Sequence, residues 1–160
     1  MEVGAQGLNS LVSVLKTDSS DSEIVSYVLD TFCNICSPEE FDEEEIDENR
    51  EDMTSVGEGF SEMFLKDKEN LTVVLNYLED FDFKIRRPSV QLLTFLLTNC
   101  AREIQQQLLE SHVGVSRMMD ILAETREVLR NDALIMLFKV TMLSWQQLLD
   151  HLYQLNLILP

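Results

Sequence analysis

Three stretches of the chain repeat one helical pattern. Residues 7–15, 70–78 and 114–122 can be laid side by side, and in each the apolar residues fall at i, i+3, i+4 and i+7. This spacing puts them on one face of an α-helix. Between residue 59 and the terminal residue, Pro88 and Gly114 are the only strong helix breakers. The chain is therefore predicted to be all-α, with short connections between helices.

Each of these helices leads into a second, more apolar one. Residues 84–95 align with 127–138 at an offset of 43, and residues 60–65 align with 104–109 at an offset of 44. Residues 23–36 form a looser first copy of the apolar helix. Three helices over about 44 residues match the length of armadillo and HEAT units. We predict an armadillo/HEAT-like helical solenoid of about two and a half to three repeats over residues 1–141.

An acidic segment interrupts this repeat. Residues 39–52 hold ten acids and one arginine, which is more than half of the chain's net charge of −17. Because like charges repel, we predict an acidic disordered loop at 38–59. The first and second copies of the helical pattern are 63 residues apart, which is 19 more than the later offset of 44. We therefore interpret the loop as an insertion. An EF-hand is disfavoured because the acidic run lacks the turning glycine, whereas an arm for a basic protein stays open.

Two local signals set helix boundaries. Residues 20–23 (Ser-Asp-Ser-Glu) have the form of a capping box at the start of the first apolar helix. The same residues resemble an acidic-kinase site, but a cap is the simpler interpretation. Pro88 has no N–H, so its helix is expected to begin within about one turn of it or to kink there.

Composition argues against several functions. The acidic balance would repel a phosphate backbone and an anionic bilayer, so we expect no nucleic-acid partner and no direct membrane insertion. No apolar run approaches the ~18 residues of a spanning helix, and the N-terminus lacks a signal peptide's basic start. Three cysteines favour a reducing compartment over a disulfide scaffold. The expectation is a soluble intracellular protein.

No catalytic, cofactor or metal motif is recognised. His112 and His151 have no nucleophile or carboxylate motif around them, and no glycine-rich phosphate loop is present. Cys33 and Cys36 form a Cys-x-x-Cys pair, for which a zinc or redox site is one interpretation. They lie at the C-terminal end of the predicted helix, where the dipole disfavours a thiolate, so buried structural thiols are the preferred interpretation. We predict no enzyme and no cofactor.

Basic residues at the starts of two apolar helices are the candidate binding site. Arg87 and Arg130 occupy equivalent repeat positions. A contact with an acidic partner protein is one interpretation, and ion pairs within the chain are the other, because cations oppose the dipole at a helix N-terminus. The candidate protein-binding residues are Arg86, Arg87, Arg130 and Asn131, and the candidate internal partners are Glu79, Asp80 and Glu124.

Four runs of sequence carry a family resemblance: residues 17–24, 79–83, 114–123 and 126–132. They resemble the globular head of the Uso-type general vesicular transport factors, the transcytosis-associated vesicle-docking proteins. The likeness extends over about residues 2–141 and includes the acidic insertion. Residues 142–160 no longer resemble the family, and we expect there a divergent C-terminal helix or tail. It would either cover the exposed end of the solenoid or mark a truncated or alternatively spliced product.

The resemblance implies an armadillo-like head of a homodimeric tether that is cytoplasmic and peripheral on Golgi and transport-vesicle membranes. Such factors dock vesicles in endoplasmic reticulum-to-Golgi and intra-Golgi transport, with Rab-family GTPases, golgins and the fusion machinery as partners. The resemblance carries no catalytic residue. The alternative from the residues alone is a free-standing armadillo-type adaptor whose acidic loop binds a basic protein, such as a histone or a ribosomal chain.

Overall fold

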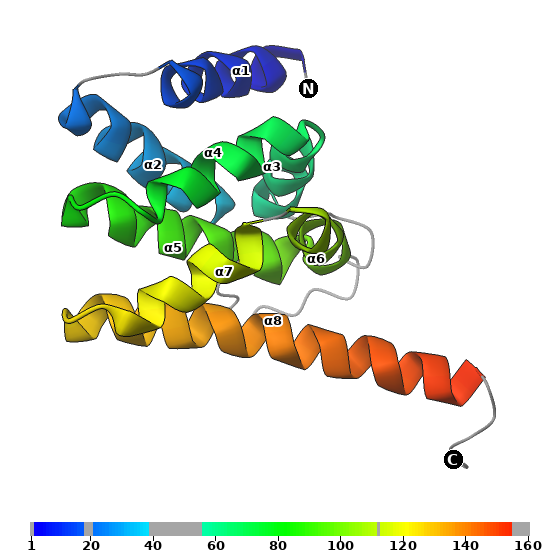
Figure 1. Ribbon diagram of the computed structural model, residues 1–160. Helices are drawn as coiled ribbons and strands as arrows, with labels where there is room; N and C mark the ends of the chain where they lie inside the picture. The colour runs from blue at the N-terminus through cyan, green and yellow to red at the C-terminus, as the bar shows by residue number, and fades with distance from the viewer. Residues whose placement is uncertain (1, 18–20, 39–55, 112, 155–160) are drawn as a thin grey trace, which may run out of the picture.

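The computed structural model describes residues 2–17, 21–38, 56–111 and 113–154, and all regular structure in these ranges is helical (Figure 1). In chain order the elements are α1 (Glu2–Lys16), α2 (Ser22–Cys36), α3 (Val56–Leu65), α4 (Lys68–Tyr77), α5 (Phe83–Asn99), α6 (Ala101–Glu110), α7 (Gly114–Asp120), the 3₁₀ turn η1 (Ile121–Ala123) and α8 (Glu127–Gln154).

The helices group into stacked repeats. α1 and α2 form the first repeat, α3 to α5 the second, and α6 to α8, with η1, the third. The last helix of each repeat stacks on that of the next, so that α5 packs against α2 on one side and α8 on the other (Figure 1). The prediction of an all-α, armadillo-like solenoid is confirmed.

The core runs between the repeats. Fully buried side chains line the two faces of α5 and the helices that cover them, among them Leu29, Phe32, Leu92, Leu93 and Met136. The rings of Phe32 in α2 and Phe64 in α3 meet edge to face, with centroids 5.2 Å apart. Burying each such side chain contributes about 1.5–3 kcal/mol, so contacts between repeats supply most of the stability.

The two ends of the acidic insertion lie side by side. At Gly57 a Cβ atom would lie 3.0 Å from the backbone oxygen of Ser37 and 3.4 Å from that of Cys36. The Asn99 amide of α5 donates to the Cys36 carbonyl at 2.8 Å and to the Ser61 hydroxyl at 2.9 Å. The chain therefore leaves the solenoid after α2 and returns to the same place, as expected of an insertion.

The predicted limits of the loop at 38–59 need a correction. α3 begins at Val56, so residues 56–59 are helical, and residues 39–55 lie outside the described part of the chain. Gly57 lies within the predicted loop but is part of α3. It is buried, and it is the residue that allows α3 to approach the end of α2.

Aspartates begin three of the helices. Asp21, Asp67 and Asp82 are the N-caps of α2, α4 and α5, and each carboxylate accepts the N–H of the residue two positions ahead. The cap of α2 is thus Asp21, whereas the capping-box pattern at 20–23 assigned that role to Ser20, which lies outside the described residues. α5 begins at Phe83, five residues before Pro88, which lies inside the helix.

α8 passes through Thr141 and ends at Gln154, which makes it the longest described helix at 28 residues. Its C-terminal half extends past the neighbouring helices (Figure 1). The predicted helix beyond residue 141 is therefore present as far as 154. Residues 155–160, the rest of the predicted tail, lie outside the described chain.

Candidate functional site: the α5–α8 edge

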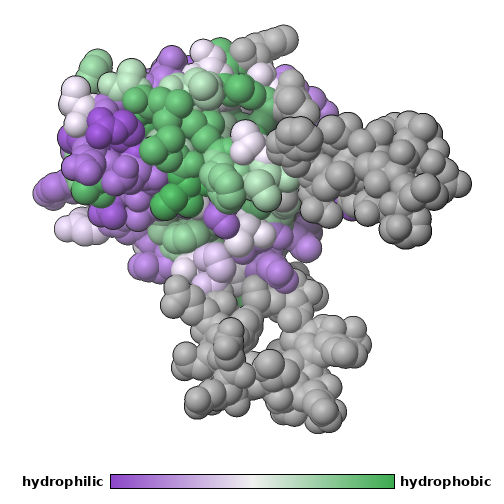
Figure 2. Space-filling view, turned by 90° about the horizontal axis from the view of Figure 1, so that it is seen from below, coloured by the Kyte–Doolittle hydropathy of each residue, from purple (hydrophilic) through white to green (hydrophobic). Residues whose placement is uncertain are grey.

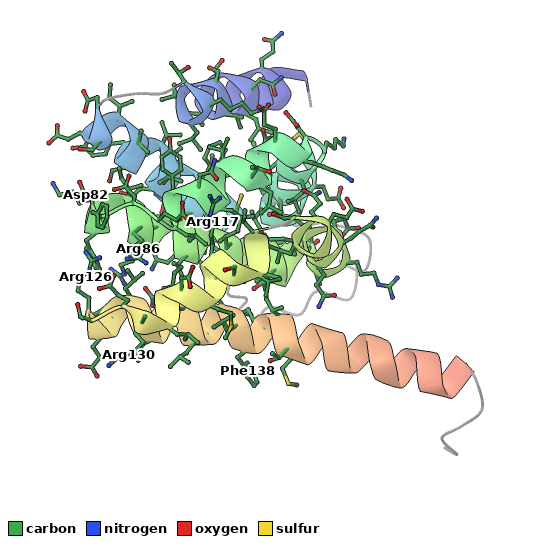
Figure 3. All side chains as sticks on the ribbon, in the orientation of Figure 1. Asp82, Arg86, Arg117, Arg126, Arg130 and Phe138 are labelled. Carbon is green, nitrogen blue, oxygen red and sulfur yellow. The ribbon has the colours of Figure 1, made fainter. Side chains whose placement is uncertain are left out.

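The N-terminal ends of α5 and α8 meet at one edge of the solenoid, and the candidate arginines gather there (Figure 3). We call this region the α5–α8 edge and define it by Phe83, Arg86 and Arg87 of α5, Glu124 and Arg126 of the η1–α8 connection, and Arg130, Asn131 and Asp132 of α8. The repeat explains why these residues meet, since equivalent turns of successive last helices stack on one another.

Glu124 is the centre of the edge. Its side chain is only 6% exposed and accepts hydrogen bonds from Arg86 at 2.8 Å and from Arg126 at 2.7 and 3.0 Å. It also accepts the backbone N–H of Arg126 at 3.1 Å, while Arg130 donates to its backbone carbonyl at 3.4 Å. The carboxylate thus fixes the connection that leads into α8 and joins it to α5.

The charged partners of Glu124 shift its pKa. Hydrogen bonds from the Arg126 side chain and backbone, together with the positive charge of Arg86, lower the pKa of Glu124 to about 2. The same ion pair raises the pKa of Arg126. Glu124 is therefore ionised at any physiological pH, which favours a structural role over acid–base chemistry.

A second ion pair lies beside the first. Arg87, the residue after Arg86, donates to Asp132 at 3.0 Å and joins α5 directly to α8. The guanidinium carbons of Arg87 and Arg126 lie 6.0 and 5.1 Å from the centre of the Phe83 ring. In such cation–π contacts the ring attracts the positive guanidinium groups towards its face.

The four candidate residues thus fall into two groups: two arginines that are held in ion pairs, and two residues that keep donors available. Arg86, whose side chain is 17% exposed, forms an ion pair with Glu124, and Arg87 forms one with Asp132. Arg130 is half-buried and makes one long side-chain hydrogen bond among the described residues, and Asn131 is exposed. The interpretation as internal ion pairs holds for Arg86 with Glu124, one of the three acids proposed from the sequence. Arg130 and Asn131 keep donors available for a partner.

The α4–α5 turn next to this edge carries the other two proposed acids. Glu79 pairs with Arg117 of α7 at 3.0 Å, and the Asp80 carboxylate accepts the backbone N–H of Asp82 at 2.8 Å. Among the described residues, neither of these bonds is with a candidate arginine. Phe81, between them, is 96% exposed. The sequence interpretation missed this projecting ring, since its exposure depends on the turn and not on residue spacing.

Sequence reasoning also missed Arg126 and Asp132. The contact of Arg126 with Glu124 depends on the bend between η1 and α8, and no helical spacing marks it.

Grooves separate successive repeats on the outer side. One of about 520 Å³ lies between α1 and the α3–α4 pair, and one of about 390 Å³ lies between α4 and the α6–α7 connection. Lysine ion pairs lie beside both grooves, Lys16 with Asp67 and Lys68 with Glu110, each at 2.6 Å. These pairs join one repeat to the next.

The thiols have no features of a reactive site. Cys33 and Cys36 are buried at the end of α2, and burial raises the pKa of Cys33 to about 12 and also raises that of Cys36. The Cys33 thiol donates to the Pro88 carbonyl at 3.2 Å. The prediction of buried structural thiols is confirmed. Within the described ranges, no three metal-binding side chains cluster, and no helix has the length and apolarity to cross a bilayer.

Known proteins are similar to most of this chain. Over 142 residues, 88% of the chain, it is 49% identical to the general vesicular transport factor p115 of Homo sapiens and to that of Bos taurus. The chain is homologous to a segment of the general vesicular transport factors. It spans 15% of the length of either protein. Golgin candidate 6 of Arabidopsis thaliana is 35% identical over 140 residues, and the chain spans 14% of the length of that protein. No family model matches.

A solved structure has a similar fold. The crystal structure of Uso1-2 matches 96% of the chain with a TM-score of 0.71 at 17% sequence identity. The chain covers 26% of that structure. At this identity the likeness concerns the fold, which is the armadillo-like stacking described above.

Proposed function

We propose that this chain is a non-catalytic protein-interaction module of vesicle tethering, equivalent to part of the armadillo-like head of the transport factors. It would act in endoplasmic reticulum-to-Golgi and intra-Golgi transport, as a cytoplasmic protein peripheral on Golgi and vesicle membranes. Its partners would be vesicle-docking proteins, among them Rab-family GTPases, golgins and the fusion machinery. The observation that carries this proposal is the 49% identity over 142 residues.

The α5–α8 edge supports a contact with an acidic group of such a partner. Arg130 presents a guanidinium with one long internal hydrogen bond, and the exposed amide of Asn131 lies next to it. Glu124 and Asp132 hold the neighbouring arginines in place, so the surface is ordered before binding. An ordered site loses less conformational entropy when a partner carboxylate or phosphate binds.

Competition in a reconstituted tethering reaction tests both parts of the proposal. Purified chain is added to transport vesicles, Golgi membranes and the full-length transport factor, and tethered vesicles are counted. A chain that occupies a partner of the full-length factor should inhibit tethering as its concentration rises. Arg130→Glu combined with Asn131→Ala should require at least about tenfold more protein, since charged hydrogen bonds contribute about 1.5–3 kcal/mol.

Arg102→Glu is the matched control, because it makes the same charge change at an exposed arginine on α6. It should inhibit as the unchanged chain does. Absence of inhibition by the unchanged chain would contradict the tethering function. Inhibition that is equal for the Arg130 variant and the control would leave the function standing but remove the α5–α8 edge as its binding site.

A second candidate function rests on the acidic run at 39–52, with its net charge of −9. In this proposal the chain is an adaptor that binds a basic protein through that run. Binding to core histones should weaken steeply between 50 and 300 mM salt and should be lost when residues 39–52 are deleted. Salt-insensitive binding would contradict it.

A further inference from the structure

The side of α8 that faces away from α5 is apolar and has no cover among the described residues. Five of its side chains are 50 to 63% exposed: Val128, Leu134, Ile135, Phe138 and Met142. Figure 2 looks at this side of the molecule and shows the apolar residues gathered into one patch beside a hydrophilic area. We call these five residues the α8 face. It is larger than the scattered apolar residues that an ordinary surface carries.

The repeat shows what covers such a face inside the solenoid. At the offset of 43, Val128 and Ile135 correspond to Ile85 and Leu92 of α5. Those two side chains are 4% and 0% exposed, because α5 lies between α2 and α8. The cover of α5 on its outer side is therefore a single helix, the last helix of the next repeat. A helix that stacks in the same way would cover the α8 face.

The ion pair between Arg87 and Asp132 shows which charge that helix should carry. It joins one last helix of the stack to the next, since Arg87 lies on α5 and Asp132 on α8. Arg130 is the residue of α8 that is equivalent to Arg87. Its one side-chain hydrogen bond among the described residues goes to the Glu124 carbonyl, at 3.4 Å. Arg130 is thus half of an ion pair between repeats, and the acid equivalent to Asp132 is the missing half.

A second cation borders the α8 face. Lys139 follows Ile135 by four residues and precedes Met142 by three, so it lies beside both on α8. Its equivalent in α5, Leu96, is 0% exposed. In the described part of the chain, neither Lys139 nor Arg130 forms an ion pair. Because an unpaired charge is costly to bury, these two cations favour an acidic cover over an uncharged one.

We propose that the α8 face and Arg130 bind an amphipathic α-helix of a partner protein, which stacks on α8 as α8 stacks on α5 and places a carboxylate on Arg130. This inference rests on the proposed function, because it names the class of partner for the Arg130 site. The packing side of α8 is a template for such a helix. It combines the acid at position 132 with five buried or partly buried apolar residues, which are Leu129, Ala133, Met136, Leu137 and Val140.

A synthetic helical peptide tests the proposal, with binding to the 160-residue chain followed by fluorescence anisotropy. The probe keeps the five apolar residues of the template and its acid, with alanine, glutamine and glutamate at the other positions. It should bind saturably. Ile135→Asp in the chain should weaken binding by about thirtyfold or more, because a charge would be buried at the centre of the contact. Tyr27→Asp, at a residue 68% exposed on α2, is the matched control and should bind as the unchanged chain does.

A charge swap tests the ion pair with Arg130. Arg130→Glu should weaken binding of the probe by about tenfold or more, since a charged hydrogen bond is replaced by repulsion. A second probe with lysine in place of the acid should bind Arg130→Glu more tightly than it binds the unchanged chain. Arg102→Glu, at an exposed arginine on α6, is the control and should bind the first probe as the unchanged chain does. Circular dichroism checks that each variant is folded.

Three results would overturn this inference: no saturable binding of the first probe, equal binding by Ile135→Asp and its control, or no reversal of preference in the charge swap. The inference and the proposed function fail separately. Loss of probe binding while the chain still inhibits tethering would overturn this inference alone. Probe binding by a chain that does not inhibit tethering would contradict the proposed function alone.

Discussion

The edge-to-face pair of Phe32 and Phe64 joins helices from two repeats, on either side of the acidic insertion. Both rings are fully buried, with centroids 5.2 Å apart. Phe32→Ala should lower the free energy of unfolding by about 4 kcal/mol, through lost transfer free energy and the cavity left behind. A domain has only about 5–15 kcal/mol in total, so the variant should be close to unfolding.

Urea unfolding followed by circular dichroism at 222 nm measures this change. With a slope of about 2 kcal/mol per molar urea, the midpoint should fall by about 2 M. Tyr27→Ala removes an aromatic ring from the same helix at a position 68% exposed, and its midpoint should change little. Equal midpoints for Phe32→Ala and Tyr27→Ala would refute the packing of α2 against α3.

A double-mutant cycle isolates the contact between the rings. Phe32→Leu and Phe64→Leu each keep most of the buried apolar volume, so each alone should cost less than alanine. Their coupling free energy should be about 0.5–1.5 kcal/mol, the value of an aromatic pair beyond its buried area. A coupling of zero would mean that the two helices, which the insertion separates in sequence, do not pack as described.

Three further predictions follow from single residues. Gly57→Val should lower the thermal midpoint, because a side chain there meets the backbone oxygens at the end of α2, whereas Gly7→Ala, in open space, should not. The depressed pKa of Glu124, about 2, means that its ion pairs stabilise the fold above its usual pKa of 4.5 and are lost as pH falls towards 2. Glu124→Gln should therefore flatten the acid branch of a plot of thermal midpoint against pH. The thiols of Cys33, Cys36 and Cys100 should react with a disulfide reagent only after unfolding, since burial raises their pKa values.

Much of the architecture could be predicted from residue spacing. The repeat offsets of 43 and 44 located six of the eight described α-helices by their apolar residues, and the enlarged offset of 63 located α1 and the insertion. These features are readable because a helix records its buried face in the period of its own sequence. Of the four candidate residues of the α5–α8 edge, Arg87 and Arg130 were found in the same way, from equivalent positions.

The particulars of that edge could not be predicted. Arg126 reaches Glu124 across a bend, Arg87 reaches Asp132 in the next repeat, and the ring of Phe83 lies beneath both arginines. The role of Gly57 could not be predicted either, because a glycine in a sequence marks a turn as readily as a close approach.

The sequence by itself determined that this chain is a stack of three-helix units, where the stack is interrupted, and to which proteins it is related. Only the tertiary structure decided which arginines are paired, which remain available to a partner, and that α8 presents an apolar face. The reason is physical. Periodicity records which side of a helix avoids water, but ion pairs and exposed faces depend on which neighbour stands opposite, and that is set when the repeats stack.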